Sequence, residues 1–402
     1  MGLQAAELLA PPVIRELRHA DGAHGFRHRP ALRYQDVDLP ELPDDLFRLL
    51  LLLGHSCILQ LARKPTSGRT TFQGAGQVAV ILAAMSGIIG GEVVLLGLIA
   101  LPQMLRLGYD KNLAIGVVCA GGALGTMVPP SIVLIIYGLT ANVSIGDLFT
   151  AAFIPGLMLA GFYVAYVLIR AYLNPAMAPV VEGPRASTAE KLRLAKGLFL
   201  PILVVIGVLG SIYGGIASVT EASAVGVLGV TLSTMIRGEF TIGLMKAAAL
   251  QTLQTVGMIV WIGIGATALV GVFNLMGGIK FVSALITGIS DEPVIVLLFM
   301  MALLFVLGMF LDWVGIALLT MPIFVPIITS MGYDPVWFGV VFCMNMQMSF
   351  LSPPFGPAAF YLKSVAPPDI SLGDIFRSLL PFIGLQALAV AVLILFPAIA
   401  IY

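Results

Sequence analysis

The sequence predicts an all-α, multi-pass membrane protein built from two copies of one unit in opposite orientations. Its composition indicates the membrane, because 59% of the 402 residues are hydrophobic and 10% are charged, whereas a soluble domain has about 25% charged residues. The long apolar runs predict helices, since a helix satisfies its own backbone hydrogen bonds in hydrocarbon. An internal repeat predicts the two copies: residues 91–137 align with residues 315–361 without a gap.

The repeat is specific in its residues. A shift of 224 positions gives 12 identities in 47 aligned positions. They include a Gly-Tyr-Asp motif at 108–110 and 332–334, and a Pro-Pro pair at 129–130 and 353–354. Repeated apolar segments that are interrupted by glycine and proline are typical of secondary transporters.

Residues 1–75 do not follow this pattern. They hold 17 of the 42 charged side chains (21 basic and 21 acidic) and all four histidines. An apolar run at 46–61 is interrupted by Arg48 and His55, which makes it marginal as a membrane span. We expect an atypical, poorly ordered N-terminal region, followed by a first repeat at 77–149.

The first element of each repeat is predicted to be a re-entrant helical hairpin. Residues 77–105 are apolar but are interrupted in the middle by Ser86 and three glycines, and glycine favours unwinding of a helix. Each arm is then about 15 Å long, half of the ~30 Å hydrocarbon thickness, so a hairpin fits better than a span. The matching segment, residues 293–331, is interrupted between Gly308 and Gly315.

The second element of each repeat is predicted to be a broken transmembrane helix, at 112–137 and 336–361. Proline removes a backbone donor and displaces the carbonyl four residues before it. Each Pro-Pro pair should therefore leave carbonyl groups free at mid-membrane, which is tolerated only where the backbone is buried in protein or lines a cavity. A final helix at 379–400 completes the second repeat, residues 293–402.

Residues 150–290 are predicted to form connecting and scaffold helices. The segment 280–290 is too short to cross the membrane and is expected at its interface. Four apolar segments are long enough to span, at 150–169, 198–215, 217–235 and 254–276.

The distribution of basic residues predicts the orientation. Arg106 and Lys111 flank the Gly-Tyr-Asp loop of the first copy, which the positive-inside rule places in the cytoplasm. The corresponding loop of the second copy, residues 332–337, has no basic residue and is expected on the outside. The rule and the repeat agree that the two copies are opposed across the membrane.

Several motifs occur in a characteristic order and spacing. They are Ser-Gly at 86–87, Gly-Thr-Met-Val-Pro-Pro-Ser at 125–131, Thr-Glu-Ala at 220–222, Leu-Asp-Trp-Val-Gly at 311–315 and Ser-Phe-Leu-Ser-Pro-Pro-Phe-Gly at 349–356. Together they resemble the large membrane subunit of tripartite ATP-independent periplasmic (TRAP) transporters. The resemblance covers residues 77–402, and residues 1–75 indicate a member that is N-terminally truncated or altered.

This resemblance implies uptake of carboxylate-bearing solutes, such as C4-dicarboxylates, with Na+ as coupling ion and no other cofactor. It implies two partners, a small membrane subunit and a periplasmic solute-binding protein. It also implies an elevator-type ion transporter in the bacterial inner membrane, in which the domain with both hairpins moves. The formal net charge of zero gives no reason to expect nucleic-acid binding.

The two breaks are candidate sodium sites, because broken helices offer the hard carbonyl oxygens and helix dipoles that a cation prefers. The first is expected to comprise Ser86, Gly125, Val128 and Pro130, and the second Gly308, Ser349, Ser352 and Phe355. The substrate carboxylate is expected between the hairpin tips, near Ser86, Gly87, Thr126, Asp312 and Asn345. For any single glycine or proline, packing or a helix kink is an equal alternative, which two matching breaks make less favoured. For Asp312 and Asn345 it is a structural hydrogen bond.

Other acidic residues are expected to be structural. Glu221 follows a Gly-Gly turn and should cap a helix, and Asp147 and Asp374, each in a Ser-x-Gly-Asp turn, should be helix N-caps. Glu92 has no assigned role.

Three other functions stay open. A carrier with inverted repeats that works without a binding protein would share these features. A non-functional fragment of the permease would explain residues 1–75. An intramembrane enzyme is disfavoured, because a metalloprotease needs His-Glu-x-x-His and a serine protease needs a base, and no histidine follows His55. We therefore expect no enzymatic activity.

Overall fold

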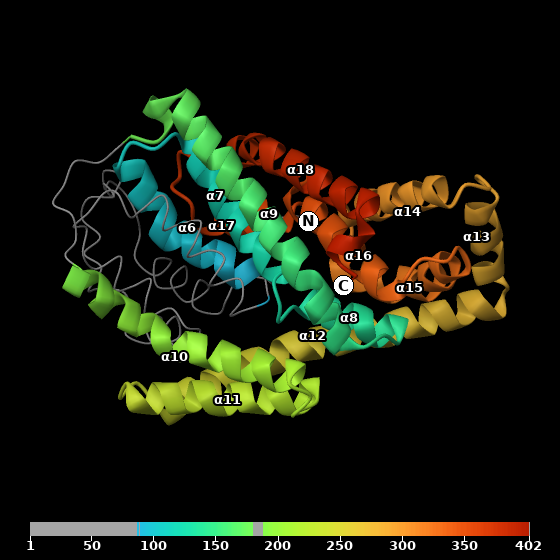
Figure 1. Ribbon diagram of the computed structural model, residues 1–402, viewed down its shortest axis with the longest axis horizontal. Coiled ribbons are helices and arrows are strands. Elements are labelled where there is room, and N and C mark those ends of the chain that lie inside the picture. Colours follow the sequence, from blue (N-terminus) through green and yellow to red (C-terminus); the bar gives the residue numbers. More distant parts are fainter. Residues whose placement is uncertain (1–86, 88, 180–187, 402) are drawn as a thin grey trace, which may run out of the picture.

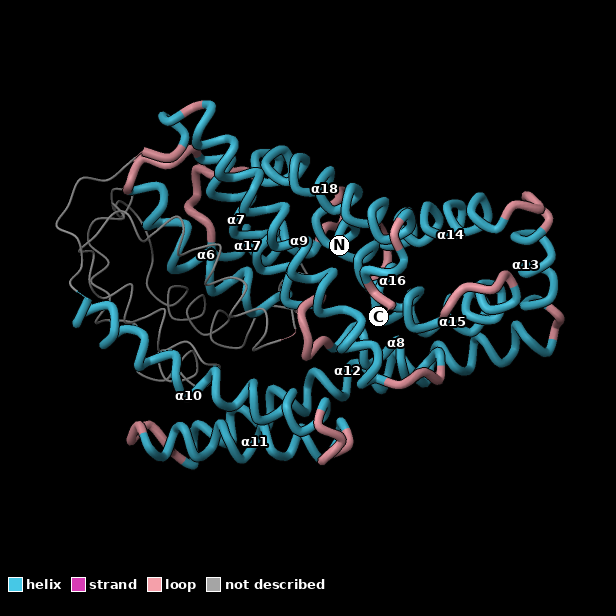
Figure 2. The backbone as a smooth tube through the Cα atoms, viewed as in Figure 1, coloured by secondary structure: helices cyan, strands magenta, loops and turns pink. Residues whose placement is uncertain are grey.

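The computed structural model describes residues 87, 89–179 and 188–401, with side chains from 199 onward in the last range. Every regular element in these ranges is a helix (Figure 1), and the connections are short (Figure 2). The expectations for residues 1–75, for the first arm of the first hairpin and for Ser86 lie outside the described residues. The all-α prediction is confirmed.

The first repeat begins with α6 (Ile89–Arg106), the second arm of its hairpin. Asp110 then caps α7 (Lys111–Ala123) by accepting a hydrogen bond from the Leu113 amide at 2.9 Å. This helix tightens into η3 (Leu124–Thr126), stops before the Pro-Pro pair, and resumes as α8 (Ile132–Ala141) with Ser131 as its N-cap. The break falls where it was predicted, because the prolines cannot continue the hydrogen-bonding pattern of the helix.

The second repeat has the same elements. Its hairpin consists of α14 (Pro293–Gly308) and α15 (Trp313–Ser330), with Asp312 as the N-cap of α15. Its broken helix consists of α16 (Pro335–Leu351) and α17 (Pro357–Val365), and α18 (Leu372–Leu395) follows. The second Pro-Pro pair lies in the break, as the first one does, and both Pro-Pro peptide bonds are cis.

The two repeats are opposed, as the basic residues predicted. The start of α7 lies beside the turn that follows α9 (Ile145–Leu173), because the Asp110 amide donates to the Met177 carbonyl at 2.9 Å. The end of α8 instead lies beside the start of α16, since the Tyr137 hydroxyl donates to the Pro335 carbonyl at 2.6 Å. The α6–α7 turn and the α15–α16 turn are therefore at opposite ends of the molecule (Figure 1).

Five helices connect the repeats: α9 (Ile145–Leu173), α10 (Thr188–Tyr213), α11 (Val219–Ile236), α12 (Ile242–Leu275) and α13 (Gly278–Thr287). Helix α9 starts five residues before the expected span, and α12 starts twelve residues early, because its polar first turns are helical as well. Helix α18 runs over 372–395 rather than 379–400, since Pro397 begins a separate 3-10 turn. The short α13 crosses the ends of its neighbours (Figure 1), as expected of an interfacial segment.

Burial divides the helices into two groups. Residues 337–351 of α16 and 113–123 of α7 are buried on all sides. In the apolar windows of α11 and α12, by contrast, 11% and 6% of residues are buried. The broken helices thus form the core, where free backbone groups are tolerated, while α11 and α12 expose apolar side chains as lipid-facing helices do.

Candidate functional site

The tip of the first hairpin touches the first break. Gly87 has a left-handed backbone, with φ +62°, and a Cβ atom there would lie 2.5 Å from the Pro130 carbonyl oxygen. Only glycine permits this approach, because a side chain would clash with the carbonyl and be strained at this φ. The predicted meeting of Gly87 with the Pro-Pro segment is therefore present in the structure.

Thr126 is the most connected residue of this break. Its hydroxyl donates to the Ala123 carbonyl at 2.9 Å and accepts from Gln347 Nε2 at 2.5 Å. Its carbonyl accepts from the Ser131 hydroxyl and, at 3.1 Å, from Cys343 Sγ. Thr126 thus organises the break through protein contacts. Its one hydroxyl proton is donated to the Ala123 carbonyl, so a substrate carboxylate, which needs a donor, would have to displace that contact.

The carbonyl oxygens of the break are less occupied. Among the described residues, none donates a hydrogen bond to the carbonyl of Gly125, Val128 or Pro130. These are the three carbonyls expected to bind a cation. Carbonyl groups that a helix break releases are suited to that role.

Glu92 lies against the same break, which the sequence analysis did not anticipate. Its side chain is 3% exposed, and its carboxylate occupies the space where a side chain at Gly125 would be. A carboxylate at this depth is costly unless it is paired or hydrogen-bonded. The sequence could have indicated this contact, because Glu92 lies in the first turn of α6, one helical turn after the hairpin tip.

The second break has an equivalent contact. A side chain at Gly308, the last residue of α14, would collide with the Ser349 hydroxyl on α16. The Phe355 amide donates to the Met309 carbonyl at 3.3 Å, which joins the break to the hairpin tip. The Ser349 hydroxyl is 2% exposed and has no hydrogen-bond partner among the described residues.

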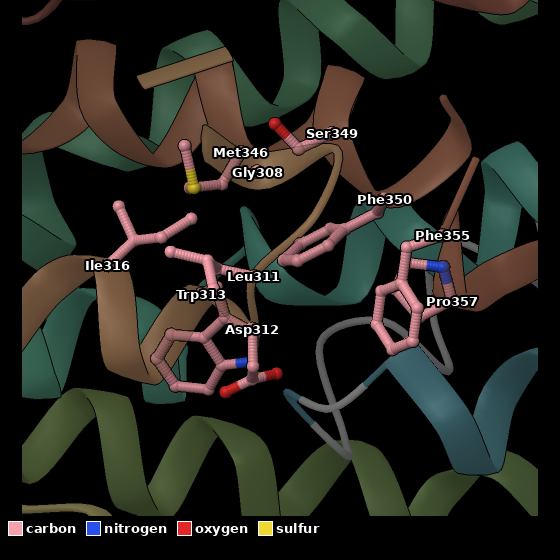
Figure 3. A pocket seen from close by; sticks show the side chains of 10 residues that line it. All are labelled: Gly308, Leu311, Asp312, Trp313, Ile316, Met346, Ser349, Phe350, Phe355 and Pro357. Carbon is pink, nitrogen blue, oxygen red and sulfur yellow. The ribbon is translucent and has the colours of Figure 1, made fainter. Parts of the chain in front are cut away.

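A small pocket opens at this second contact (Figure 3). Gly308, Asp312, Ser349 and Phe355 line it, together with apolar side chains from α15 and α16. The Asp312 carboxylate lies on the side of the pocket away from Ser349 (Figure 3) and accepts from the Val314 amide at 3.0 Å. The pocket brings together three of the four predicted ligands of the second sodium site.

Two of the predicted residues make mainly structural contacts. The Asn345 amide donates to the Met301 carbonyl at 3.0 Å and ties α16 to α14, away from the pocket. The Ser352 hydroxyl donates to the Met348 carbonyl at 2.7 Å, yet its oxygen keeps a lone pair at the break. For Asn345 the structure favours the alternative of a structural hydrogen bond.

The two breaks lie close together in space because the repeats interlock. Gln347 and Ser349 on α16 reach the first and the second break respectively. Gly90 of the first hairpin also lies against the Tyr361 ring of α17. A Cβ atom added at Gly90 would be 3.2 Å from Cζ of that ring. The break before α17 contacts the second hairpin tip through the hydrogen bond from the Phe355 amide to the Met309 carbonyl. The second broken helix therefore contacts both hairpins.

The remaining acidic residues are structural, with one correction. Glu221 forms a capping box with Ser218, as expected. Asp147 and Asp374 are not N-caps; Ser144 and Ser371 are, and the two aspartates lie at the third helical position. In each case the serine hydroxyl accepts a hydrogen bond from the backbone amide of the aspartate, so the serine is the N-cap. The described residues contain no cluster of three or more potential metal-binding His, Cys, Asp or Glu side chains.

The donor set nevertheless fits a monovalent cation. Sodium binds neutral oxygen atoms, and helix breaks commonly provide them. The Ser349 hydroxyl and the carbonyls of the first break, which have no hydrogen-bond partner among the described residues, are such atoms. Gly125, Val128 and Ser349 are buried and Pro130 is half-buried, so a cation would satisfy most of these oxygens where water has limited access.

Comparison with known proteins places the chain in a family. Residues 72–399 match the family model "Tripartite ATP-independent periplasmic transporter, DctM component". The chain is 29% identical over 325 residues to the C4-dicarboxylate TRAP transporter large permease protein DctM of Pseudomonas aeruginosa, covering 80% of this chain and 74% of the relative. It is 32% identical over 331 residues to the ectoine/5-hydroxyectoine TRAP transporter large permease protein UehC of Ruegeria pomeroyi, with the same two coverages, 80% and 74%.

A solved structure shares the fold. The crystal structure of the Alcanivorax borkumensis YdaH transporter matches with a TM-score of 0.62 at 16% sequence identity, covering 89% of this chain and 85% of that one. The predicted fold class, an all-α membrane protein with inverted repeats and two broken helices, is confirmed.

These findings establish the class of the protein. Six helices in the described residues are long and apolar enough to cross a membrane, so the chain is a multi-pass membrane protein. Its relatives are named as transporter permeases rather than enzymes, and the family works with a small membrane subunit and a periplasmic binding protein. The chain belongs to the large membrane subunits, or DctM components, of the tripartite ATP-independent periplasmic transporters.

Proposed function

We propose that this chain carries a small carboxylate-bearing solute of the C4-dicarboxylate type into the cell, driven by a sodium gradient across the bacterial inner membrane. In this proposal a periplasmic solute-binding protein delivers the solute and a small membrane subunit completes the membrane complex. The observation that carries the proposal is the contact of a hairpin tip with each helix break, through Gly87 and Pro130 and through Gly308 and Ser349.

Sodium coupling is supported by the oxygen atoms at these contacts. In the first site, the carbonyls of Gly125, Val128 and Pro130 would hold the ion, with Ser86 at the adjacent hairpin tip. In the second site, Gly308, Ser349, Ser352 and Phe355 would hold it. Because both sites include residues from a hairpin and a broken helix, a bound cation would favour the closed hairpin and thereby the occluded substrate site.

The charge distribution supports joint binding of cation and anion. In the described parts of the hairpins and broken helices, basic residues lie only at helix ends, as Arg106, Lys111 and Lys363, whereas Glu92 and Asp312 lie near the hairpin tips. A buried organic anion without a basic partner is costly. Bound cations would compensate its charge, so the substrate carboxylate should bind well only when sodium is bound.

Transport by the reconstituted complex tests this proposal. The full-length chain, co-purified with its small membrane subunit, is placed in proteoliposomes and supplied with the binding protein and radiolabelled succinate or ectoine. We expect succinate uptake that requires an inward sodium gradient and is absent with potassium. Uptake that is equal in both salts would contradict sodium coupling, and uptake of ectoine alone would contradict the substrate class.

Two variants sharpen the test. Ser352→Ala removes a predicted ligand oxygen and should raise the sodium concentration for half-maximal uptake by about tenfold, the size typical of losing one supporting contact at an ion site. Ser330→Ala is the matched control, because its hydroxyl also donates within its own helix, to Ile327 at 2.7 Å, but at the far end of α15. Uptake that needs no binding protein would favour the alternative of a two-component or single-chain carrier.

A further inference from the structure

The amide side chain of Gln347 is a buried polar group to which the proposed function gives no role. Gln347 belongs to α16 of the second repeat, is 0% exposed, and reaches across to the first repeat. Its Nε2 donates to the Thr126 hydroxyl at 2.5 Å, and its Oε1 has no hydrogen-bond partner among the described residues. A buried oxygen without a donor is unusual in folded proteins and calls for an explanation.

The assignment of the two amide atoms follows from the hydrogen bonds of Thr126. A threonine hydroxyl has one proton, and Thr126 donates it to the Ala123 carbonyl at 2.9 Å. The hydroxyl can then only accept from Gln347, so the NH2 group must face it. The carbonyl oxygen of the Gln347 amide is therefore the atom left without a donor, whichever way an amide is first placed.

The surroundings of this oxygen resemble a cation site more than a packing defect. Thr126 lies between Gly125 and Val128, whose carbonyls have no donor among the described residues. Cys343, one helical turn before Gln347, donates to the Thr126 carbonyl at 3.1 Å. The orphaned amide oxygen thus belongs to a side chain that is hydrogen-bonded into the first break, the segment that also carries the released carbonyls. A cation bound within reach of both would satisfy them together.

We propose that Gln347 is a cation ligand that the second repeat contributes to the sodium site of the first repeat, and that it couples the two sites. The inference rests on the sodium coupling proposed above. Ser349 lies two residues farther along α16 and faces the second break. Because residues two positions apart point to different sides of a helix, one rigid segment of α16 serves both sites, and occupation of one site orients the other.

Thermal unfolding of the purified full-length chain in detergent tests the inference without a transport assay. The midpoint temperature is measured over a series of NaCl concentrations, with KCl holding the ionic strength constant. A ligand that binds only the folded state raises this midpoint as it saturates its site. We expect sodium-specific stabilisation of the wild type with a Hill coefficient above one.

Gln347→Met removes both amide atoms at similar side-chain volume. It should raise the sodium concentration for half-maximal stabilisation by about tenfold and bring the Hill coefficient close to one. Gln386→Met is the matched control. Gln386 is also 0% exposed, donates from Nε2 to a hydroxyl, that of Tyr163, at 2.8 Å, and has an orphaned Oε1. It joins α18 to α9, away from both breaks, and its variant should leave the sodium midpoint unchanged.

A second pair of variants covers the case in which Gln347→Met does not fold. Thr126→Val removes the hydroxyl that holds the Gln347 amide and should shift the sodium midpoint in the same direction, whereas Thr126→Ser keeps the hydroxyl and should not. An unchanged midpoint and Hill coefficient in Gln347→Met or, failing that, in Thr126→Val would overturn the inference, as would an equal shift in Gln386→Met. A wild type with no sodium-specific stabilisation would instead overturn the proposed sodium coupling itself.

Discussion

Single glycines set the closest approaches in the two sites. Gly87 brings a hairpin tip onto the Pro130 carbonyl, Gly125 leaves room for the Glu92 carboxylate, and Gly308 accommodates the Ser349 hydroxyl. In each case the missing side chain allows a backbone or polar group to approach where a Cβ atom would collide. Glycine frequency alone, which is high in membrane helices, does not identify these positions.

Gly308→Ala tests this interpretation at one residue. The added methyl group would collide with the Ser349 hydroxyl, and overpacking of this kind costs about 1–3 kcal/mol. We expect the free energy of unfolding, measured by denaturant titration in mixed micelles, to fall by about that amount. The fall should exceed that of Gly315→Ala, because a Cβ atom at Gly315 would meet open space.

The double variant Gly308→Ala/Ser349→Gly separates stability from ion binding. Removing the Ser349 side chain makes room for the new methyl group, so the free energy of unfolding should largely return. The sodium dependence of uptake should be weaker than in the wild type, because a ligand oxygen is gone. Stability that is not restored by the second change would show that the collision is not the cause.

At the scale of elements, the broken helices organise the protein. Helix α16 is buried along most of its length and makes hydrogen bonds to two other segments: Asn345 bonds to α14, and both Gln347 and Cys343 bond to the first break. One helix therefore links the second hairpin to the break of the first repeat. The lipid-facing α11 and α12 have few such contacts.

Asn345→Leu tests whether the bond between α14 and α16 is structural. The change removes one hydrogen bond to the Met301 carbonyl and also an orphaned amide oxygen, so the net loss of stability should be about 0.5–1.5 kcal/mol. We expect the apparent affinity for the transported solute and for sodium to be unchanged in proteoliposomes. A loss of substrate affinity of tenfold or more would restore Asn345 to the substrate site.

At the scale of the whole molecule, the opposed repeats give the protein two chemically different ends. The end with the α6–α7 turn also has the ion pair of Lys111 with Asp374, at 3.1 Å. The other end has the α15–α16 turn, which lacks basic residues in 332–337. The positive-inside rule assigns the first end to the cytoplasm.

Cysteine labelling in intact cells tests this orientation. In a Cys57→Ser background the two other cysteines, Cys119 and Cys343, are buried. Leu139→Cys, near the end of α8 and 67% exposed in the wild type, should react with an impermeant maleimide from outside. Ala176→Cys, exposed at the opposite end after α9, should react only after the membrane is permeabilised. The reverse pattern would invert the topology.

The sequence by itself determined the class of the protein, the second hairpin, the helix breaks and the opposition of the repeats. These features depend on apolar length, on glycine and proline, and on loop charge, which are local properties that a chain displays without its fold. The helix ends depend on more than this local pattern. Asp147 and Asp374 lie at the third helical position rather than at the predicted cap, and α12 and α18 begin earlier than predicted. The reason is that a cap depends on which amide a side chain meets.

Only the tertiary structure decided which residues complete the sites. Thr126 and Gln347 are 221 positions apart, and Gly125 meets a carboxylate from another helix. Such contacts arise when the two repeats interlock, so neither repeat displays them alone. Packing between distant segments fixes which oxygens lose their partners, and it is on those atoms that the proposed cation sites rest.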